Sequence, residues 1–138
     1  MAQYLFSFTI LLLSLSILRL EAAPSDDQTR FLRLMKKSLS GNLLAGWDVI
    51  GSKPACNFTG IECNNFGYVV KIDVSGWSLS GRFPEDVCTY FPELRILCLG
   101  HNHLHGKFPD SITNCSSLEE PNMTSTYLTG TLPETFHR

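Results

Sequence analysis

One stretch, from Leu94 to Pro109, constrains this 138-residue chain more than any other. It reads LRILCLGHNHLHGKFP and has leucine at positions 94, 97, 99 and 104 and asparagine at position 102. Its second half has the form L-x-G-x-apolar-P, and the same form stands at 79–84 and at 128–133. The three prolines lie 25 and 24 residues apart. The recurring L-x-G-x-apolar-P form and the proline spacing therefore define one period, which is typical of a repeat architecture.

The spacing L-x-x-L-x-L-x-x-N-x-L is that of a leucine-rich repeat, in which each repeat adds a short strand to a common sheet. In such a coil Leu94, Leu97, Leu99 and Leu104 point inward. Asn102 is expected to bond to the turn backbone, where an unpaired amide would be costly. The predicted fold is an α/β solenoid whose repeats, of about 24 residues each, form a short parallel sheet. Three repeats are expected over 67–138.

The third predicted repeat departs from the pattern at two positions. Pro121 stands where the first two repeats have Ile72 and Leu97, and Thr126 replaces the asparagine. Proline lacks the strand N–H and is tolerated mainly at sheet edges. We therefore expect the third repeat to be the least ordered. In the first repeat Trp77 stands at the asparagine position.

The first residues predict a secretory signal. An apolar run of 14 residues extends from Leu5 to Leu18, whereas a membrane-spanning helix needs about 20. Small residues follow at Ala22 and Ala23, and cleavage after either one is consistent with such a signal. We predict a signal peptide over 1–23, and no other stretch is apolar enough to span a bilayer.

The segment 24–66 is predicted to cap the array, because a repeat stack would otherwise expose its apolar end. An amphipathic helix is expected over 28–39, with Ser25, Asp26 and Asp27 offering N-cap residues. Four apolar residues would share one face of this helix: Phe31, Leu34, Met35 and Leu39. Trp47 and a Cys56–Cys63 pair follow before the first repeat.

Secretion changes the interpretation of the five cysteines, because disulfides persist in oxidising compartments. The spacings do not fit the paired cysteines of zinc sites. We predict one disulfide between Cys56 and Cys63. A second is predicted between Cys88 and Cys115, which are about one period apart and would be neighbours in adjacent coils. Cys98 is left over, and its side chain is expected on the concave face of the sheet.

Together these segments resemble a known family. The stretches FLRLMKKSLSGNLLAGWDV, CNFTGIEC, VSGWSLSGRFPEDVCTYFPELRIL and LGHNHL are similar to the N-terminal cap and first repeats of plant leucine-rich-repeat receptor-like kinases. Within that family, they are most similar to the receptors for C-terminally encoded peptides. The likeness covers nearly everything from Phe31 onward.

The resemblance implies extracellular recognition of a secreted peptide or protein partner at the cell surface. In the family, signalling uses a cytoplasmic Ser/Thr kinase domain, and the kinase signatures H-R-D and D-F-G are absent from this sequence. We therefore expect a truncated ectodomain that does not signal alone. The alternative is a free-standing small secreted repeat protein that binds another protein, as an inhibitor or a co-receptor-like module.

Several surface residues are candidates for recognition or modification. The concave-face candidates for ligand contact are Asp73, Ser75, Cys98 and Gly100. N-glycosylation acceptors stand at Asn57, Asn114 and Asn122, each in an N-x-S/T motif. Asn122 aligns with Cys98, so a glycan there would obstruct the concave face. The first three repeats are therefore expected to be scaffold rather than the main ligand groove.

Other function classes find no support in the sequence. The net charge of −2 without a basic block argues against nucleic acid as a partner. No nucleophile elbow, zinc-protease motif or phosphate-binding glycine loop is present, so we expect neither an enzyme nor a cofactor. His101, His103 and His105 form H-x-H-x-H. The turn at Asn102 and the inward Leu104 should keep these rings from converging on a metal.

Overall fold

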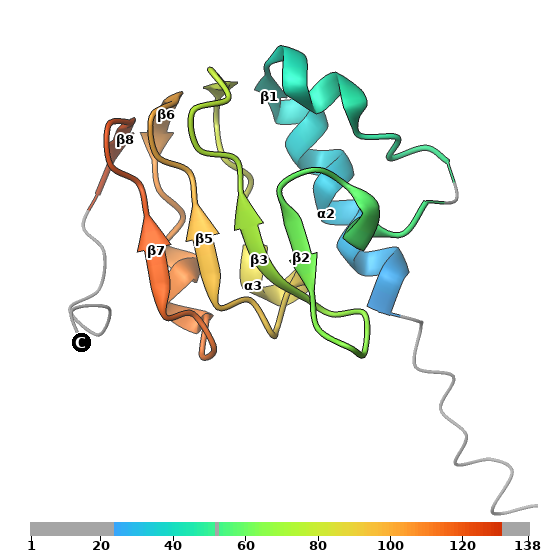
Figure 1. Ribbon diagram of the computed structural model, residues 1–138. Helices are drawn as coiled ribbons and strands as arrows, with labels where there is room; N and C mark the ends of the chain where they lie inside the picture. Colours follow the sequence, from blue (N-terminus) through green and yellow to red (C-terminus); the bar gives the residue numbers. More distant parts are fainter. Residues whose placement is uncertain (1–23, 52, 131–138) are drawn as a thin grey trace, which may run out of the picture.

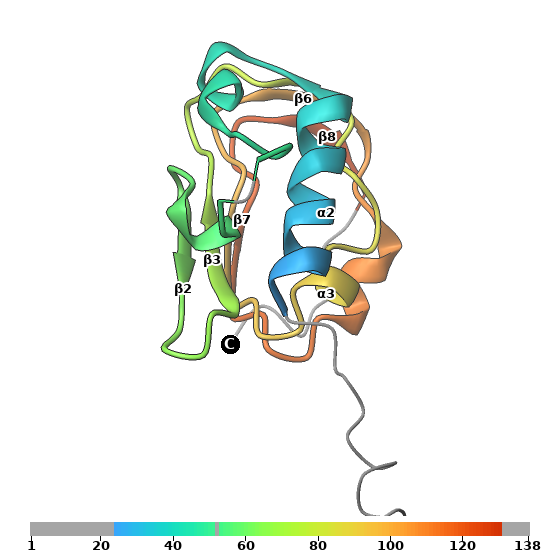
Figure 2. The same ribbon diagram turned by 90° about the vertical axis from the view of Figure 1, so that its right-hand side faces the viewer.

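The computed structural model describes residues 24–51 and 53–130 (Figure 1). The predicted signal peptide, 1–23, lies outside the described residues. Within these two ranges the strands form two sheets of four strands each, in the orders β2-β3-β5-β7 and β1-β4-β6-β8. Helices α2 and α3 lie on one side of the β2-β3-β5-β7 sheet, and no described helix covers its other side (Figure 2).

Helix α2, Pro24–Ser38, is the longest element of the cap. It begins four residues earlier than expected, because proline fits the first turn of a helix, where its missing N–H is not needed. Asp26 and Asp27 therefore lie in the first turn and not before it. There their negative charges interact favourably with the helix dipole.

The buried stripe of α2 differs from the predicted one. Phe31, Met35 and the following Leu39 are buried as expected, but Leu34 is 39% exposed and Leu32 is fully buried. The stripe includes Gln28, which is only 2% exposed. The buried positions 28, 31, 32, 35 and 39 follow the helical period. A search for apolar residues alone could not include Gln28, and it did not distinguish buried Leu32 from exposed Leu34.

The rest of the cap connects α2 to the first repeat. It contains β1, Leu39–Ser40, and the 3-10 turns η1, Asn42–Gly46, and η2, Ala55–Asn57. Strand β2, Ile61–Cys63, then pairs antiparallel with β3, Val69–Asp73. Trp47 is buried between Phe58 and Trp77, with ring centroids 5.9 and 6.0 Å away. The tryptophan at the asparagine position of repeat one thus packs the repeat against the cap.

The parallel part of the first sheet follows the predicted period. Strand β5, Ile96–Cys98, lies between β3 and β7, Glu120–Asn122. Ile72, Leu97 and Pro121 are in register, and so are Asp73, Cys98 and Asn122. Each repeat therefore contributes one strand at an equivalent position.

The second sheet was not predicted. It contains β1, β4 (Ser80–Gly81), β6 (His103–Lys107) and β8 (Tyr127–Thr129). The last three strands fall on the L-x-G segments, and the glycines Gly81, Gly106 and Gly130 have φ of 124°, 93° and 109°. Residues other than glycine rarely adopt such positive φ angles. The repeated glycine is therefore the sequence signal for this sheet.

Two short helical segments complete the side of the coil opposite the open face. They are α3, Val87–Tyr90, and η3, Asp110–Asn114. A disulfide joins Cys88 of α3 to Cys115, directly after η3. This is the second pair expected from the sequence.

Asn102 fixes the turn of repeat two from inside the core, as predicted. It is 3% exposed. Its Oδ1 accepts a hydrogen bond from the Leu79 N–H at 2.9 Å. Its Nδ2 donates to the carbonyls of Val74, Leu99 and Gly100 at 2.9, 2.9 and 3.2 Å. One side chain therefore satisfies four buried backbone groups from two repeats.

Candidate ligand surface on the concave sheet

The open face of the β2-β3-β5-β7 sheet, turned away from α2 and α3, is called the concave face here (Figure 2). Strand side chains alternate between the two faces of a sheet. Ile72 and Leu97 point into the core and are fully buried. The side chains that alternate with them form the concave face: Glu62, Lys71, Asp73, Ile96, Cys98, Glu120 and Asn122.

A hollow of about 390 Å³ lies at the cap end of this face. Strands β2 and β3 and the turn after β3 line it, with Thr59, Gly60, Ile61, Glu62, Lys71, Asp73, Ser75 and Trp77. Two of the four predicted concave-face candidates, Asp73 and Ser75, therefore border one depression.

The charged groups of the hollow are already paired within the chain. Lys71 Nζ lies 2.9 Å from Glu62 Oε1. The hydrogen bond and the charge of Glu62 raise the pKa of Lys71 above its usual value, with a smaller contribution from Asp73. The Oδ1 of Asp73 accepts a hydrogen bond from the Ser75 N–H at 3.2 Å. A ligand entering here would have to compete with these internal partners.

Cys98 is the free cysteine among the described residues, and it is half-buried between Asp73 and Asn122. Burial raises the pKa of its thiol, and the negative charges of Asp73 and Glu120 raise it further. Lys71 acts in the opposite direction. At neutral pH Cys98 is therefore a protonated thiol of low reactivity.

Gly100 does not belong to the exposed surface, contrary to the sequence-based expectation. It is buried. A Cβ at this position would lie 3.1 Å from the Thr124 carbonyl oxygen and 3.2 Å from Asn122 Oδ1. The side chain of Asn122 covers Gly100, so this glycine makes room for a neighbouring repeat.

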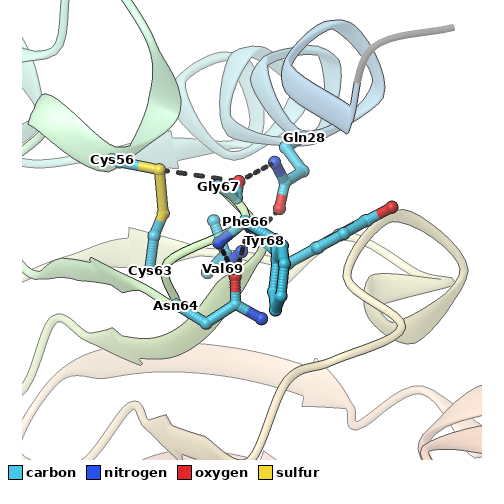
Figure 3. Close-up of a disulfide and its surroundings, with 8 residues drawn as sticks. All are labelled: Gln28, Cys56, Cys63, Asn64, Phe66, Gly67, Tyr68 and Val69. Atoms are coloured by element: carbon cyan, nitrogen blue, oxygen red, sulfur yellow. Dashed lines mark hydrogen bonds between the residues drawn. A yellow bond between two sulfur atoms is a disulfide. The ribbon is translucent and has the colours of Figure 1, made fainter.

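The first disulfide holds the cap beside the concave face. It joins Cys56 to Cys63, whose Cα atoms are 5.6 Å apart, as expected from the sequence. Figure 3 shows the hairpin that follows it. Gln28 Nε2 donates to the Gly67 carbonyl at 2.9 Å, and its Oε1 accepts from the Val69 N–H at 2.6 Å. These two hydrogen bonds of Gln28, called the Gln28 clamp below, were not predicted from the sequence.

Asn64 fixes the tip of the same hairpin. Its Oδ1 accepts hydrogen bonds from the N–H groups of Phe66 and Tyr68 at 2.9 and 3.1 Å. Phe66 nevertheless remains 82% exposed at the turn. The cap thus presents a rigid hairpin whose position is set by α2 and by the disulfide.

The three candidate glycosylation sites lie on different surfaces. Asn57 ends η2 in the cap, Asn114 ends η3, and Asn122 lies on β7 in the concave face. All three are exposed. The structure thus leaves each asparagine accessible and places only Asn122 on the candidate ligand surface.

The three histidines are exposed and lie away from the concave sheet. His101 sits in the turn before β6, whereas His103 and His105 belong to β6. The ring of His103 stacks on that of Tyr127, with the two ring centroids 6.1 Å apart. Over the described ranges there is no group of three or more histidine, cysteine, aspartate or glutamate residues able to hold a metal ion. No helix in those ranges has the length and apolar composition needed to cross a membrane.

Comparison with known families supports the cap-and-repeat description. Residues 25–64 match the leucine rich repeat N-terminal domain, and residues 93–115 match the leucine rich repeat. The receptor protein-tyrosine kinase CEPR1 of Arabidopsis thaliana is 51% identical over 114 residues. That match covers 80% of this chain and 12% of the kinase. The predicted resemblance to plant receptor-like kinases is confirmed.

Solved structures share the fold. The PEPR1–AtPEP1 structure superposes with a TM-score of 0.66 at 22% identity, covering 80% of this chain and 19% of that one. The Arabidopsis receptor kinase HAESA, in complex with the peptide hormone IDA and the co-receptor SERK1, gives 0.58 at 24% identity. That match covers 80% of this chain and 23% of the HAESA chain. Both are related to this chain by fold.

Proposed function

Because the chain carries a leucine-rich-repeat N-terminal domain and matches a plant receptor kinase over most of its own length, we propose that it is an extracellular recognition module. Its role would be that of the N-terminal end of a peptide-hormone receptor ectodomain. The 51% identity to CEPR1 carries this proposal. The division into a signal peptide (1–23), a cap (24–66) and the first repeats of a solenoid (67–138) belongs to the same proposal.

Within such an ectodomain, we assign this segment a structural role. Lys71 and Asp73 already have partners in the chain, and Gly100 is covered by Asn122. The cap is fastened by a disulfide and by the Gln28 clamp. A rigid end with internally satisfied charges supports the repeats beside it. The peptide or protein partner would then bind mainly outside 24–130.

A chimera tests this assignment. Residues 24–130 replace the matching segment of CEPR1, and the probe is a C-terminally encoded peptide, the ligand class implied by the sequence resemblance. We expect the dissociation constant to stay within about threefold of the parent receptor, a change of less than about 1 kcal/mol. Asp73→Ala and Ser75→Ala in the chimera should leave it unchanged as well.

Two outcomes distinguish the role of the cap from that of the concave face. Replacing both Cys56 and Cys63 by serine should lower the yield of folded, secreted chimera, because it removes the cross-link that closes the cap. Loss of peptide binding in Asp73→Ala, with folding intact, would show that this segment contributes to the ligand groove. Specific binding of another protein by residues 24–130 alone would instead support the small secreted binding protein.

A further inference from the structure

The three glycosylation motifs share one structural pattern. In each, the asparagine and the hydroxyl residue two positions later are exposed, and the residue between them points inward. Phe58 and Cys115 are buried at the middle positions, and Met123 is half-buried. This alternation presents the acceptor asparagine to solvent without exposing the core. A glycan is therefore compatible with the fold at every motif.

Asn122 differs from the other two acceptors in its surroundings. Its Oδ1 accepts a hydrogen bond from the Thr124 N–H at 3.0 Å, which holds the carboxamide over Gly100. Among the described residues its Nδ2 has no protein acceptor. The nitrogen that would carry a sugar is therefore left free, and the oxygen fixes its orientation.

The neighbour of Asn122 on the next strand is the free thiol. Cys98 and Asn122 are paired in register across β5 and β7, and adjacent strands lie about 4.8 Å apart. Both side chains belong to the concave face. The first sugars on Asn122 would extend several ångströms above this face, over the space through which a reagent approaches Cys98.

We propose that Asn122 carries an N-linked glycan that covers the β5–β7 part of the concave face and shields the Cys98 thiol. The proposal rests on the secretion assumed in the proposed function. In the modification, Asn122 Nδ2 forms a bond to C1 of the sugar of a lipid diphosphate-linked oligosaccharide. The bond between C1 and the diphosphate oxygen breaks, the lipid diphosphate leaves, and one proton of the Asn122 amide is released to a base.

Shielding has a physical use in a secreted chain with an odd cysteine. An accessible thiol in an oxidising compartment exchanges with disulfides of other molecules, and the rate depends on access. A glycan beside Cys98 blocks that access without a covalent partner. It also confines the open part of the concave face to the hollow near the cap.

The test expresses the full chain in a eukaryotic host and recovers it from the medium and from the cells. Glycopeptide mass spectrometry measures occupancy at Asn57, Asn114 and Asn122, and maleimide labelling under native conditions measures the reactivity of Cys98. Thr124→Ala removes the acceptor motif but keeps Asn122 and its bond to the backbone. Thr124→Ser is the matched control, because it keeps the motif. Thr59→Ala removes the glycan motif of the cap.

We expect Asn122 to be glycosylated in the wild-type chain and in Thr124→Ser. Cys98 should react about tenfold faster in Thr124→Ala than in either of these, and Thr59→Ala should not change its rate. Glycans on Asn57 or Asn114 with none on Asn122 would overturn this inference and leave secretion standing. Equal labelling rates despite a glycan on Asn122 would overturn the shielding. A secreted chain without a glycan at any of the three motifs would also overturn this inference and leave secretion standing. Retention of the chain inside the host cell would refute the secretion assumed in the proposed function.

Discussion

Repeats two and three follow the same path through the same two sheets, but their turns are fastened differently. Asn102 makes four hydrogen bonds to backbone groups in repeat two. At the equivalent place in repeat three, Thr126 Oγ1 makes one, to the Met123 carbonyl at 2.9 Å. Leu97 is fully buried, whereas Pro121 opposite it is half-buried. Without the asparagine, the chain of repeat three still follows the same path. Its turn side chain, however, makes fewer hydrogen bonds to the backbone.

Pro121 leaves the pairing of β7 with β5 intact. The Glu120 N–H donates to the Arg95 carbonyl at 3.0 Å, and the Asn122 carbonyl accepts from the Leu99 N–H at 2.7 Å. Residues of a parallel strand bond alternately to the two neighbouring strands. The nitrogen of Pro121 therefore points away from β5, and its missing N–H does not interrupt the β5–β7 pairing.

The largest predicted difference between the two repeats comes from removing their turn side chains. Asn102→Ala should lower the free energy of unfolding by about 3 kcal/mol or more, because it leaves several buried backbone groups without partners. Thr126→Ala, the matched control, should cost about 1 kcal/mol or less, since it removes one bond at a half-buried site. Urea unfolding of the two variants measures both values. Equal losses would show that the asparagine does not distinguish the repeats.

Restoring the asparagine in repeat three should narrow the difference. Thr126→Asn is expected to raise the free energy of unfolding by about 1 kcal/mol, because its amide can donate to the Met123 carbonyl and to neighbouring turn groups. Thr126→Val keeps the shape without the hydroxyl and should lower stability slightly. A loss of stability in Thr126→Asn as large as in Thr126→Val would contradict this reasoning. Urea unfolding again provides the comparison.

Both repeats share a strained residue just before the turn side chain. His101 and Ser125 have φ of 54° and 57°, whereas the first repeat has Gly76 here at 69°. His101→Gly should stabilise the protein by about 0.5–1 kcal/mol, because left-handed backbone is costly for other residues. His103→Gly, at an exposed strand position, should destabilise it by a similar amount. Thermal unfolding of the pair should therefore shift in opposite directions.

The smallest predicted effect concerns the thiol on the strand shared by both repeats. The pKa of Cys98 is raised from 9.0, mainly by burial and then by Asp73. The folded state therefore holds this proton more tightly than the unfolded state. As a result, the free energy of unfolding does not change with this group's titration below pH 9, and it falls as the pH rises through the raised pKa. The rate of alkylation of the unglycosylated chain should reach half its maximum above pH 9.0. Asp73→Asn should lower that midpoint and Lys71→Met should raise it; a wild-type midpoint below 9.0 would contradict the assignment.

Much of the first sheet could be predicted because leucine spacing and period report directly on burial. Leu94, Leu97, Leu99 and Asn102 lie where the repeat pattern placed them. The two cysteine pairs could also be predicted from the sequence: Cys88 and Cys115 are 27 residues apart, close to one period, and Cys56 and Cys63 close a short loop. These features depend on local spacing, which a single sequence displays.

The parts that were missed depend on contacts between distant segments. Gln28 is buried because Gly67 and Val69, 39 and 41 residues away, supply its partners. Gly100 is covered by a side chain from the next repeat. Predicting the second sheet would have required the backbone angles of the repeated glycines. A glycine in the sequence permits a positive φ but does not show that the residue adopts one. Spacing in the sequence does not show which polar groups will meet.

Native-state hydrogen exchange compares the two repeats most directly, because it measures local opening at each amide. Amides of repeat two that donate to repeat one, such as Arg95 to the Val70 carbonyl and His103 to the Leu79 carbonyl, should be protected nearly to the level of global unfolding. Amides of repeat three around Thr124 and Thr126 should exchange markedly faster. Protection in repeat three equal to that in repeat two would contradict the conclusion that the internal asparagine bonds, and not the shared path, make a repeat rigid.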